Sequence, residues 1–143
     1  MNTFKTALMA TLLTCGLTVP ALSYTEEDFY TASSSTAVSI TGDIQMDDFS
    51  ITFGNGETLE FSDLVADNFS VNGQRVPASL YRVRNPADPV LENDNQLCGS
   101  GDVTYIATWG ADPLVTNLAV FTGDDAPSDS SEMCASYVYE ITP

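Results

Sequence analysis

The chain has 143 residues, of which 20 are Asp or Glu, 4 are Lys or Arg and none is His. The resulting net charge of −16 disfavours nucleic acid and anionic lipid as partners, because like charges repel, and it favours a cationic protein. The absence of histidine excludes Ser-His-Asp and Cys-His catalysis and histidine-bound zinc.

The first 23 residues are typical of a secretory signal peptide. Lys5 supplies the positive charge, an apolar stretch covers residues 7–19, and Ala21 and Ser23 are the small residues that a signal peptidase recognises. This stretch is shorter than the roughly 20 residues of a membrane span, and no later stretch reaches that length. We therefore expect an exported protein, periplasmic or extracellular, with no membrane span; a lipoprotein processed at Cys15 is the alternative.

The mature chain after residue 23 has 120 residues, which is enough for a single domain with one core. It keeps three arginines and no lysine against the same 20 acids, so its net charge is −17 and Schiff-base chemistry is excluded. Its two cysteines, Cys98 and Cys134, predict a disulfide, because an exported protein meets oxidising conditions.

The mature chain begins with a polar segment over residues 24–35, which predicts a loosely held N-terminal arm with a possible helical turn. A single β domain is then expected over residues 36–143. Within it, apolar residues alternate with small or polar ones over residues 37–46, so we expect a first strand that is bent at Gly42.

The clearest local pattern is a hairpin around the Gly-Asn-Gly sequence of residues 54–56. A two-residue turn would set Ile51 opposite Glu60, whereas a three-residue loop with Gly56 in the left-handed region sets Ile51 opposite Leu59. We expect the three-residue loop, because only this register places the apolar residues of both strands on one face.

Further elements follow this hairpin. Residues 62–67 are compatible with one helical turn or with a bent connection, and the Asn72-Gly73 pair predicts a second tight turn. A strand is expected over residues 80–84. The stretch 85–96, rich in Pro, Asn and Asp, predicts the longest surface loop.

The C-terminal third predicts three more strands. The first covers residues 103–109, with Val103, Tyr105, Ala107 and Trp109 expected on one face. Four consecutive apolar residues, 118–121, predict a strand that is covered on both faces. After the acidic loop 123–132, residues 136–141 form the last strand. The chain therefore predicts a single small antiparallel β-barrel or β-sandwich of roughly 7–9 strands with one disulfide.

Three groups of residues are candidates for a site. Four acids in the loop 123–132 could bind Ca²⁺, although their spacing is not that of an EF-hand and a solvated loop is the alternative; they are Asp124, Asp125, Asp129 and Glu132. The three arginines, which would form an anion-docking patch or pair with acids across the sheet, are Arg75, Arg82 and Arg84. The aromatic residues, which would form a binding face or part of the core, are Tyr105 and Trp109.

The sequence Gly-Ser-Gly-Asp-Val-Thr-Tyr at residues 99–105 resembles the Ser-Gly-rich loop followed by tyrosine in small periplasmic inhibitors of c-type lysozyme. That resemblance implies an exported, disulfide-bearing β-barrel that meets a cationic enzyme. The resemblance covers seven residues, and the chain lacks the basic residue and the flanking cysteine pattern of the family.

Together these observations predict a non-enzymatic, exported acidic β-domain that binds a cationic protein partner in the cell envelope, as an inhibitor or accessory protein. One alternative is a structural or adhesive module stabilised by Ca²⁺, the single cofactor considered. The other is a hydrolase that uses two carboxylates, although 20 acids give no basis for choosing the pair.

Overall fold

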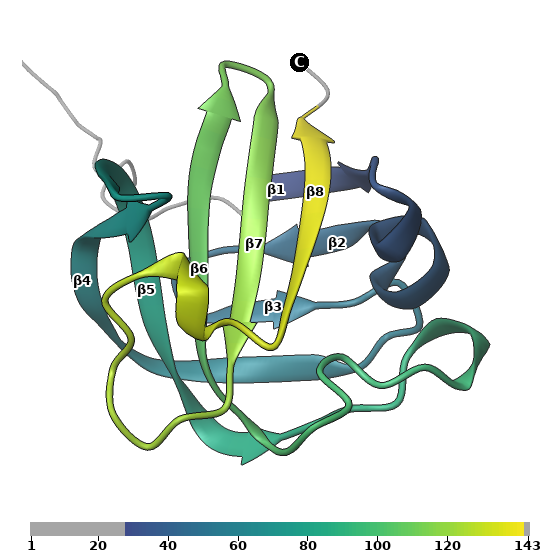
Figure 1. Ribbon diagram of the computed structural model, residues 1–143. Helices are drawn as coiled ribbons and strands as arrows, with labels where there is room; N and C mark the ends of the chain where they lie inside the picture. Colours follow the sequence, from purple (N-terminus) through teal and green to yellow (C-terminus); the bar gives the residue numbers. More distant parts are fainter. Residues whose placement is uncertain (1–27, 142–143) are drawn as a thin grey trace, which may run out of the picture.

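The computed structural model describes residues 28–141 and shows eight antiparallel strands that form a closed barrel (Figure 1). Each strand pairs with the next one along the chain, and β1 also pairs with β8, which closes the sheet. The predicted all-β fold is confirmed, and the sheet takes the form of a barrel. The strands are β1 (Asp28–Ala32), β2 (Ile44–Met46), β3 (Ser50–Thr52), β4 (Thr58–Val71), β5 (Gln74–Ala87), β6 (Val103–Asp112), β7 (Val115–Phe121) and β8 (Ala135–Ile141).

The N-terminal part of the barrel corrects the prediction of a loose arm over residues 24–35. Asp28–Ala32 form β1, which pairs with β2 on one side and β8 on the other. The polar composition hid this strand because its outward side chains face solvent and its backbone hydrogen bonds come from distant strands. Residues 24–27, the signal peptide predicted for residues 1–23 and the alternative site at Cys15 lie outside the described residues.

A π-helical turn, η2 (Ala37–Thr41), replaces the first half of the strand predicted over residues 37–46. The Ser34 hydroxyl accepts the N–H of Ala37, 3.1 Å away, at the start of the turn. At its end, the buried hydroxyl of Thr41 lies 2.7 Å from that of Tyr139. These tertiary contacts favour the turn over the strand that alternation alone suggests.

The β3–β4 hairpin has the predicted register, with Ile51 opposite Leu59. Gly56 adopts φ 95°, the left-handed conformation that the three-residue loop requires. The second predicted turn is also confirmed, since Asn72 and Gly73 join β4 to β5 with φ values of 52° and 80°. Residues 62–67, which the sequence left open, belong to the long, irregularly paired strand β4.

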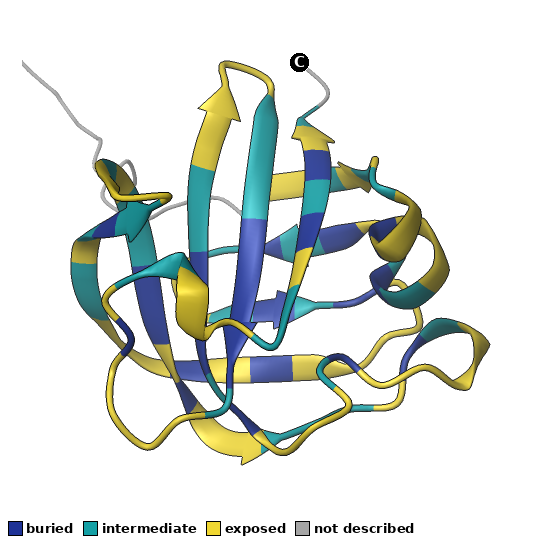
Figure 2. Cartoon of the chain, viewed as in Figure 1, coloured by how far each residue is buried: buried dark blue, intermediate teal, exposed yellow. Residues whose placement is uncertain are grey.

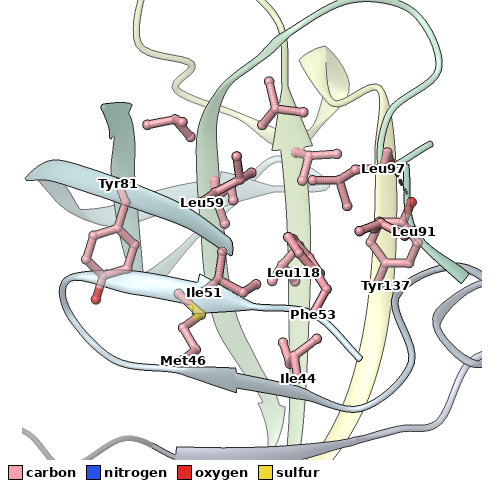
Figure 3. Close-up of a cluster of buried hydrophobic side chains, with 14 of the residues drawn as sticks. Ile44, Met46, Ile51, Phe53, Leu59, Tyr81, Leu91, Leu97, Leu118 and Tyr137 are labelled. Atoms are coloured by element: carbon pink, nitrogen blue, oxygen red, sulfur yellow. Dashed lines mark hydrogen bonds between the residues drawn. The ribbon is translucent and has the colours of Figure 1, made fainter. Parts of the chain in front are cut away.

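The inner core fills the middle of the barrel with apolar side chains from all eight strands and the 88–102 loop (Figure 3). Tyr137 donates a hydrogen bond from its hydroxyl to the carbonyl of Leu97, 2.5 Å away, and so ties β8 to that loop. Next to Leu97, Cys98 forms the predicted disulfide with Cys134, with 5.7 Å between the Cα atoms. The loop is therefore fixed to the barrel at two adjacent residues.

A second, outer core lies on the other side of the sheet, where the distal half of β4 packs against β6 and β7. Phe69 of β4 is 1% exposed, and its ring lies 5.8 Å from that of Trp109 and 5.7 Å from that of Phe121. Residues 118–121 alternate between the inner and outer cores, as the prediction of a strand covered on both faces requires.

One face assignment on β6 is wrong. Val103 belongs to the inner core, whereas Tyr105 and Ala107 belong to the outer core, so Val103 does not share their face. The change occurs where the pairing of β5 with β6 is irregular, since the register shifts between Arg82 and Ala87.

Candidate binding site at the mouth of the barrel

The barrel interior changes from apolar to polar toward the end that carries the β6–β7 turn. On β6, Ile106 faces inward in the core, and the next inward-facing residue toward the turn is Thr108. On β7, Leu118 faces inward in the core, and the next inward-facing residue toward the same turn is Thr116. Figure 2 shows the matching change in burial, from buried residues in the lower halves of these strands to partly buried and exposed ones above. We call this end of the barrel the mouth.

Two adjoining hollows of about 340 and 190 Å³ occupy the mouth and share Tyr30, Ser79 and Thr108 as walls. We call them together the mouth groove. The other residues that line it are Asp28, Met46, Asp47, Asp48, Asp67, Pro77, Ala78, Tyr81, Trp109, Gly110 and Thr116.

The mouth groove combines negative charge with aromatic rings. Its lining includes four carboxylates, those of Asp28, Asp47, Asp48 and Asp67, and it includes no Lys or Arg among the described residues. Three aromatic rings, those of Tyr30, Tyr81 and Trp109, complete its walls. Carboxylates and the faces of aromatic rings both attract cations. The groove is therefore suited to an ammonium or guanidinium group.

Tyr81 is held firmly in the wall of the groove. Its hydroxyl donates a hydrogen bond to Asp48 Oδ1, 2.7 Å away, and its ring stacks on Phe61 with centroids 4.4 Å apart. Burial, and next the hydrogen bond and charge of Asp48, raise the pKa of Tyr81 well above its usual value. Tyr81 thus stays protonated and keeps orienting the Asp48 carboxylate.

Tyr30 borders both hollows and packs against the inner core. Its ring meets that of Tyr139 edge to face, with centroids 6.5 Å apart. Burial, and next the charge of Asp28, raise the pKa of Tyr30. Trp109, on the opposite wall, is held by its contact with Phe69 in the outer core. The aromatic walls therefore rest on both cores.

The arginines do not form one patch. Arg82 pairs with Asp63 directly across the sheet, with 3.3 Å between Nε and Oδ1, as the pairing alternative expects. Arg82 also donates to the Tyr105 hydroxyl, 2.7 Å away, and lies over that ring. Arg84 donates to the carbonyl of Phe61 at 3.4 Å, and Arg75 lies at the tip of the β4–β5 hairpin.

The predicted aromatic pair is divided between two places. Trp109 lines the mouth groove, whereas Tyr105 is 2% exposed and belongs to the outer core. Tyr105 instead borders a hollow of about 270 Å³ together with Arg82, Arg84 and Asp124. That hollow carries both signs of charge, so its chemistry favours neither a cation nor an anion.

The predicted calcium loop uses two of its carboxylates for its own hydrogen bonds. Asp129 accepts from the backbone N–H of Ser131 at 2.7 Å and from its hydroxyl at 2.5 Å, and these bonds lower the pKa of Asp129. Glu132 accepts from the N–H of Ser128 at 3.3 Å. Within residues 28–141 the structure forms no group of three or more Asp, Glu, His or Cys side chains that could hold a metal ion.

The sequence analysis missed the four aspartates of the mouth groove. They come from β1, the β2–β3 turn and β4, and only the closure of the barrel brings them together. The adjacent Asp47 and Asp48 were the one local signal, because two acids in a tight turn place charge at the end of a hairpin.

Comparison of the chain with protein-family models, with curated proteins and with solved structures finds no match in any of the three. In the part of the chain that the structure describes, no helix is long and apolar enough to cross a membrane. The chemistry of the mouth groove is therefore the basis for assigning a function.

Proposed function

We propose that this protein is an exported, non-enzymatic binding protein whose mouth groove holds basic side chains of a protein partner in the cell envelope. In this role it acts as an inhibitor or accessory protein. The observation that carries the proposal is the gathering of four carboxylates and three aromatic rings in one open groove whose lining includes no cation.

The magnitudes support a protein partner with several basic groups. A cation over an exposed aromatic ring gains about 0.5–1 kcal/mol, and an exposed ion pair gains a similar amount. Several such contacts are needed for a stable complex, and a basic protein can provide them at once. The net charge of −17 on the mature chain adds long-range attraction, which raises the rate of association with such a partner.

The side chains of the mouth support binding rather than catalysis. The groove has three aliphatic hydroxyls, those of Ser79, Thr108 and Thr116, that could act as nucleophiles only with an adjacent base. The mature sequence has no His or Lys to serve as that base. We assign the four aspartates of the groove to attracting a cation, because the aromatic rings beside them favour the same ligand.

The experiment compares three forms of the mature protein. The mouth variant carries D28N, D47N, D48N and D67N; asparagine keeps an acceptor oxygen for the β2–β3 turn and for Tyr81. The loop variant removes the same charge from the loops that precede β6 and follow β7, at the ends of these strands away from the β6–β7 turn, with D94N, D102N, D124N and D125N. Equal net charge makes the two variants a matched pair.

Each form is immobilised and exposed to envelope and medium proteins at low and at physiological salt. We expect the wild type and the loop variant to retain the same basic protein stoichiometrically at physiological salt, and the mouth variant to lose it. Retention only at low salt would show that the charge serves solubility, and equal loss by both variants would show that the mouth has no special role.

A further inference from the structure

The β2–β3 turn beside the mouth groove exposes a phenylalanine. Phe49 is 67% exposed and directly follows Asp47 and Asp48, two of the carboxylates that line the groove. Asp48 accepts the hydroxyl of Tyr81 in the groove wall. An exposed aromatic ring next to a charged groove can contact an apolar side chain of the same partner that the groove binds.

The turn that carries Phe49 is rigid. Asp47 Oδ1 accepts the backbone N–H groups of Phe49, at 2.7 Å, and of Ser50, at 2.9 Å. The N–H of Asp47 donates to the Ser50 carbonyl at 3.1 Å, and the Phe49 carbonyl accepts the N–H of Phe61 at 2.8 Å. Since the backbone on both sides of Phe49 is already fixed, a partner would lose little affinity to ordering it.

A second exposed apolar residue lies beside the groove. Leu64 of β4 is 52% exposed and lies directly opposite Tyr81 in the pairing of β4 with β5. Leu64 also lines a hollow that shares Asp67 with the mouth groove. An apolar rim beside a charged hollow is complementary to a surface in which an apolar side chain lies next to a basic one.

We propose that Phe49 is an apolar anchor for the basic partner, and that the segment recognised by the mouth carries an aliphatic side chain immediately beside its arginine or lysine. This inference rests on the proposed function, because the charge of the groove selects the basic residue. The inference adds an apolar contact between Phe49 and the aliphatic side chain, which charge alone does not supply.

The test uses two synthetic nine-residue peptides of equal charge, each with two arginines. One has leucine beside each arginine and the other has glycine there. The proteins are the wild type, F49A and F29A. Phe29 is the matched control, because it is 66% exposed and lies on β1, where alternation turns its side chain away from Tyr30 and toward the outer wall.

We expect the wild type and F29A to bind the leucine peptide at least about fivefold more tightly than the glycine peptide, and F49A to lose this preference. Equal binding of both peptides by the wild type, or an undiminished preference in F49A, would overturn the anchor and leave the proposed function standing. Failure of the wild type to bind either arginine peptide at physiological salt would also overturn the anchor, whereas the proposed function is overturned only if the mouth variant and the loop variant retain the basic protein equally.

Discussion

Phe69 gives a specific prediction about stability, because it is the buried side chain through which the distal half of β4 packs into the outer core. Phe69 is 1% exposed and contacts Trp109 and Phe121. Replacing it with alanine removes the ring from between these two neighbours and leaves a cavity. Since Trp109 also lines the mouth groove, the substitution loosens one wall of the candidate site.

The expected cost follows from burial. Truncation of a buried Phe to Ala costs about 3–5 kcal/mol, which includes the lost transfer free energy and the cavity. Two ring contacts, each worth about 0.5–1.5 kcal/mol, place Phe69 in the middle or upper part of that range. A domain of ordinary stability, about 5–15 kcal/mol, would lose a large fraction of its free energy of unfolding.

The assay is urea denaturation followed both by far-ultraviolet circular dichroism and by the fluorescence of Trp109, the single tryptophan. F69A should unfold at a lower urea concentration, and its Trp109 signal should change at or before the loss of strand signal. F29A is the control and should change stability by less than about 0.5 kcal/mol, because Phe29 is exposed. A loss below about 1 kcal/mol in F69A would refute the account of the outer core.

Three further predictions concern the inner core and its attachments. Replacing Cys98 and Cys134 by serine should lower the free energy of unfolding by about 4 kcal/mol, because the disulfide closes a loop with a sequence separation of 36 residues; two free thiols in the unreduced wild type would contradict the pairing. Y137F should cost about 1–3 kcal/mol in urea denaturation, because it leaves the buried carbonyl of Leu97 without its donor; an unchanged midpoint would show that this bond is unimportant. Burial, and next the charge of Asp88, raise the pKa of Tyr137 to about 12, whereas an unfolded tyrosine loses its proton near pH 10. The unfolded chain therefore binds fewer protons between these values, so stability should be complete below about pH 10 and fall as pH rises toward 12; tyrosinate absorbance with all midpoints near 10 in the folded protein would be inconsistent with this.

Much of the local structure was predictable because it depends on neighbours in sequence. The register of Ile51 and Leu59 follows from a period of two on each side of a glycine loop, and only one register buries both apolar sets. Residues 118–121 have no polar position to turn toward solvent, so a strand covered on both faces was the consistent interpretation. The two cysteines that follow residue 23 allow a single disulfide between them.

The parts that were wrong or missed depend on distant contacts. β1 lies in a mostly polar stretch of the sequence and becomes a strand by pairing with β2 and β8, and η2 is held by Thr41 meeting Tyr139, 98 residues further along the chain. The mouth groove likewise assembles Asp28, Asp48 and Asp67 from separate strands and turns. No spacing in the sequence marks these three aspartates among the 20 acids.

The central claim is tested most directly by the affinity of the purified basic partner, once captured, for the wild type, the mouth variant and the loop variant at physiological salt. Isothermal titration should give a dissociation constant at least about tenfold weaker for the mouth variant, because its removed charges lie in the contact. The loop variant, with the same net charge, should stay within about threefold of the wild type. Equal weakening of the two variants, or stronger weakening of the loop variant, would contradict the assignment of binding to the mouth of the barrel.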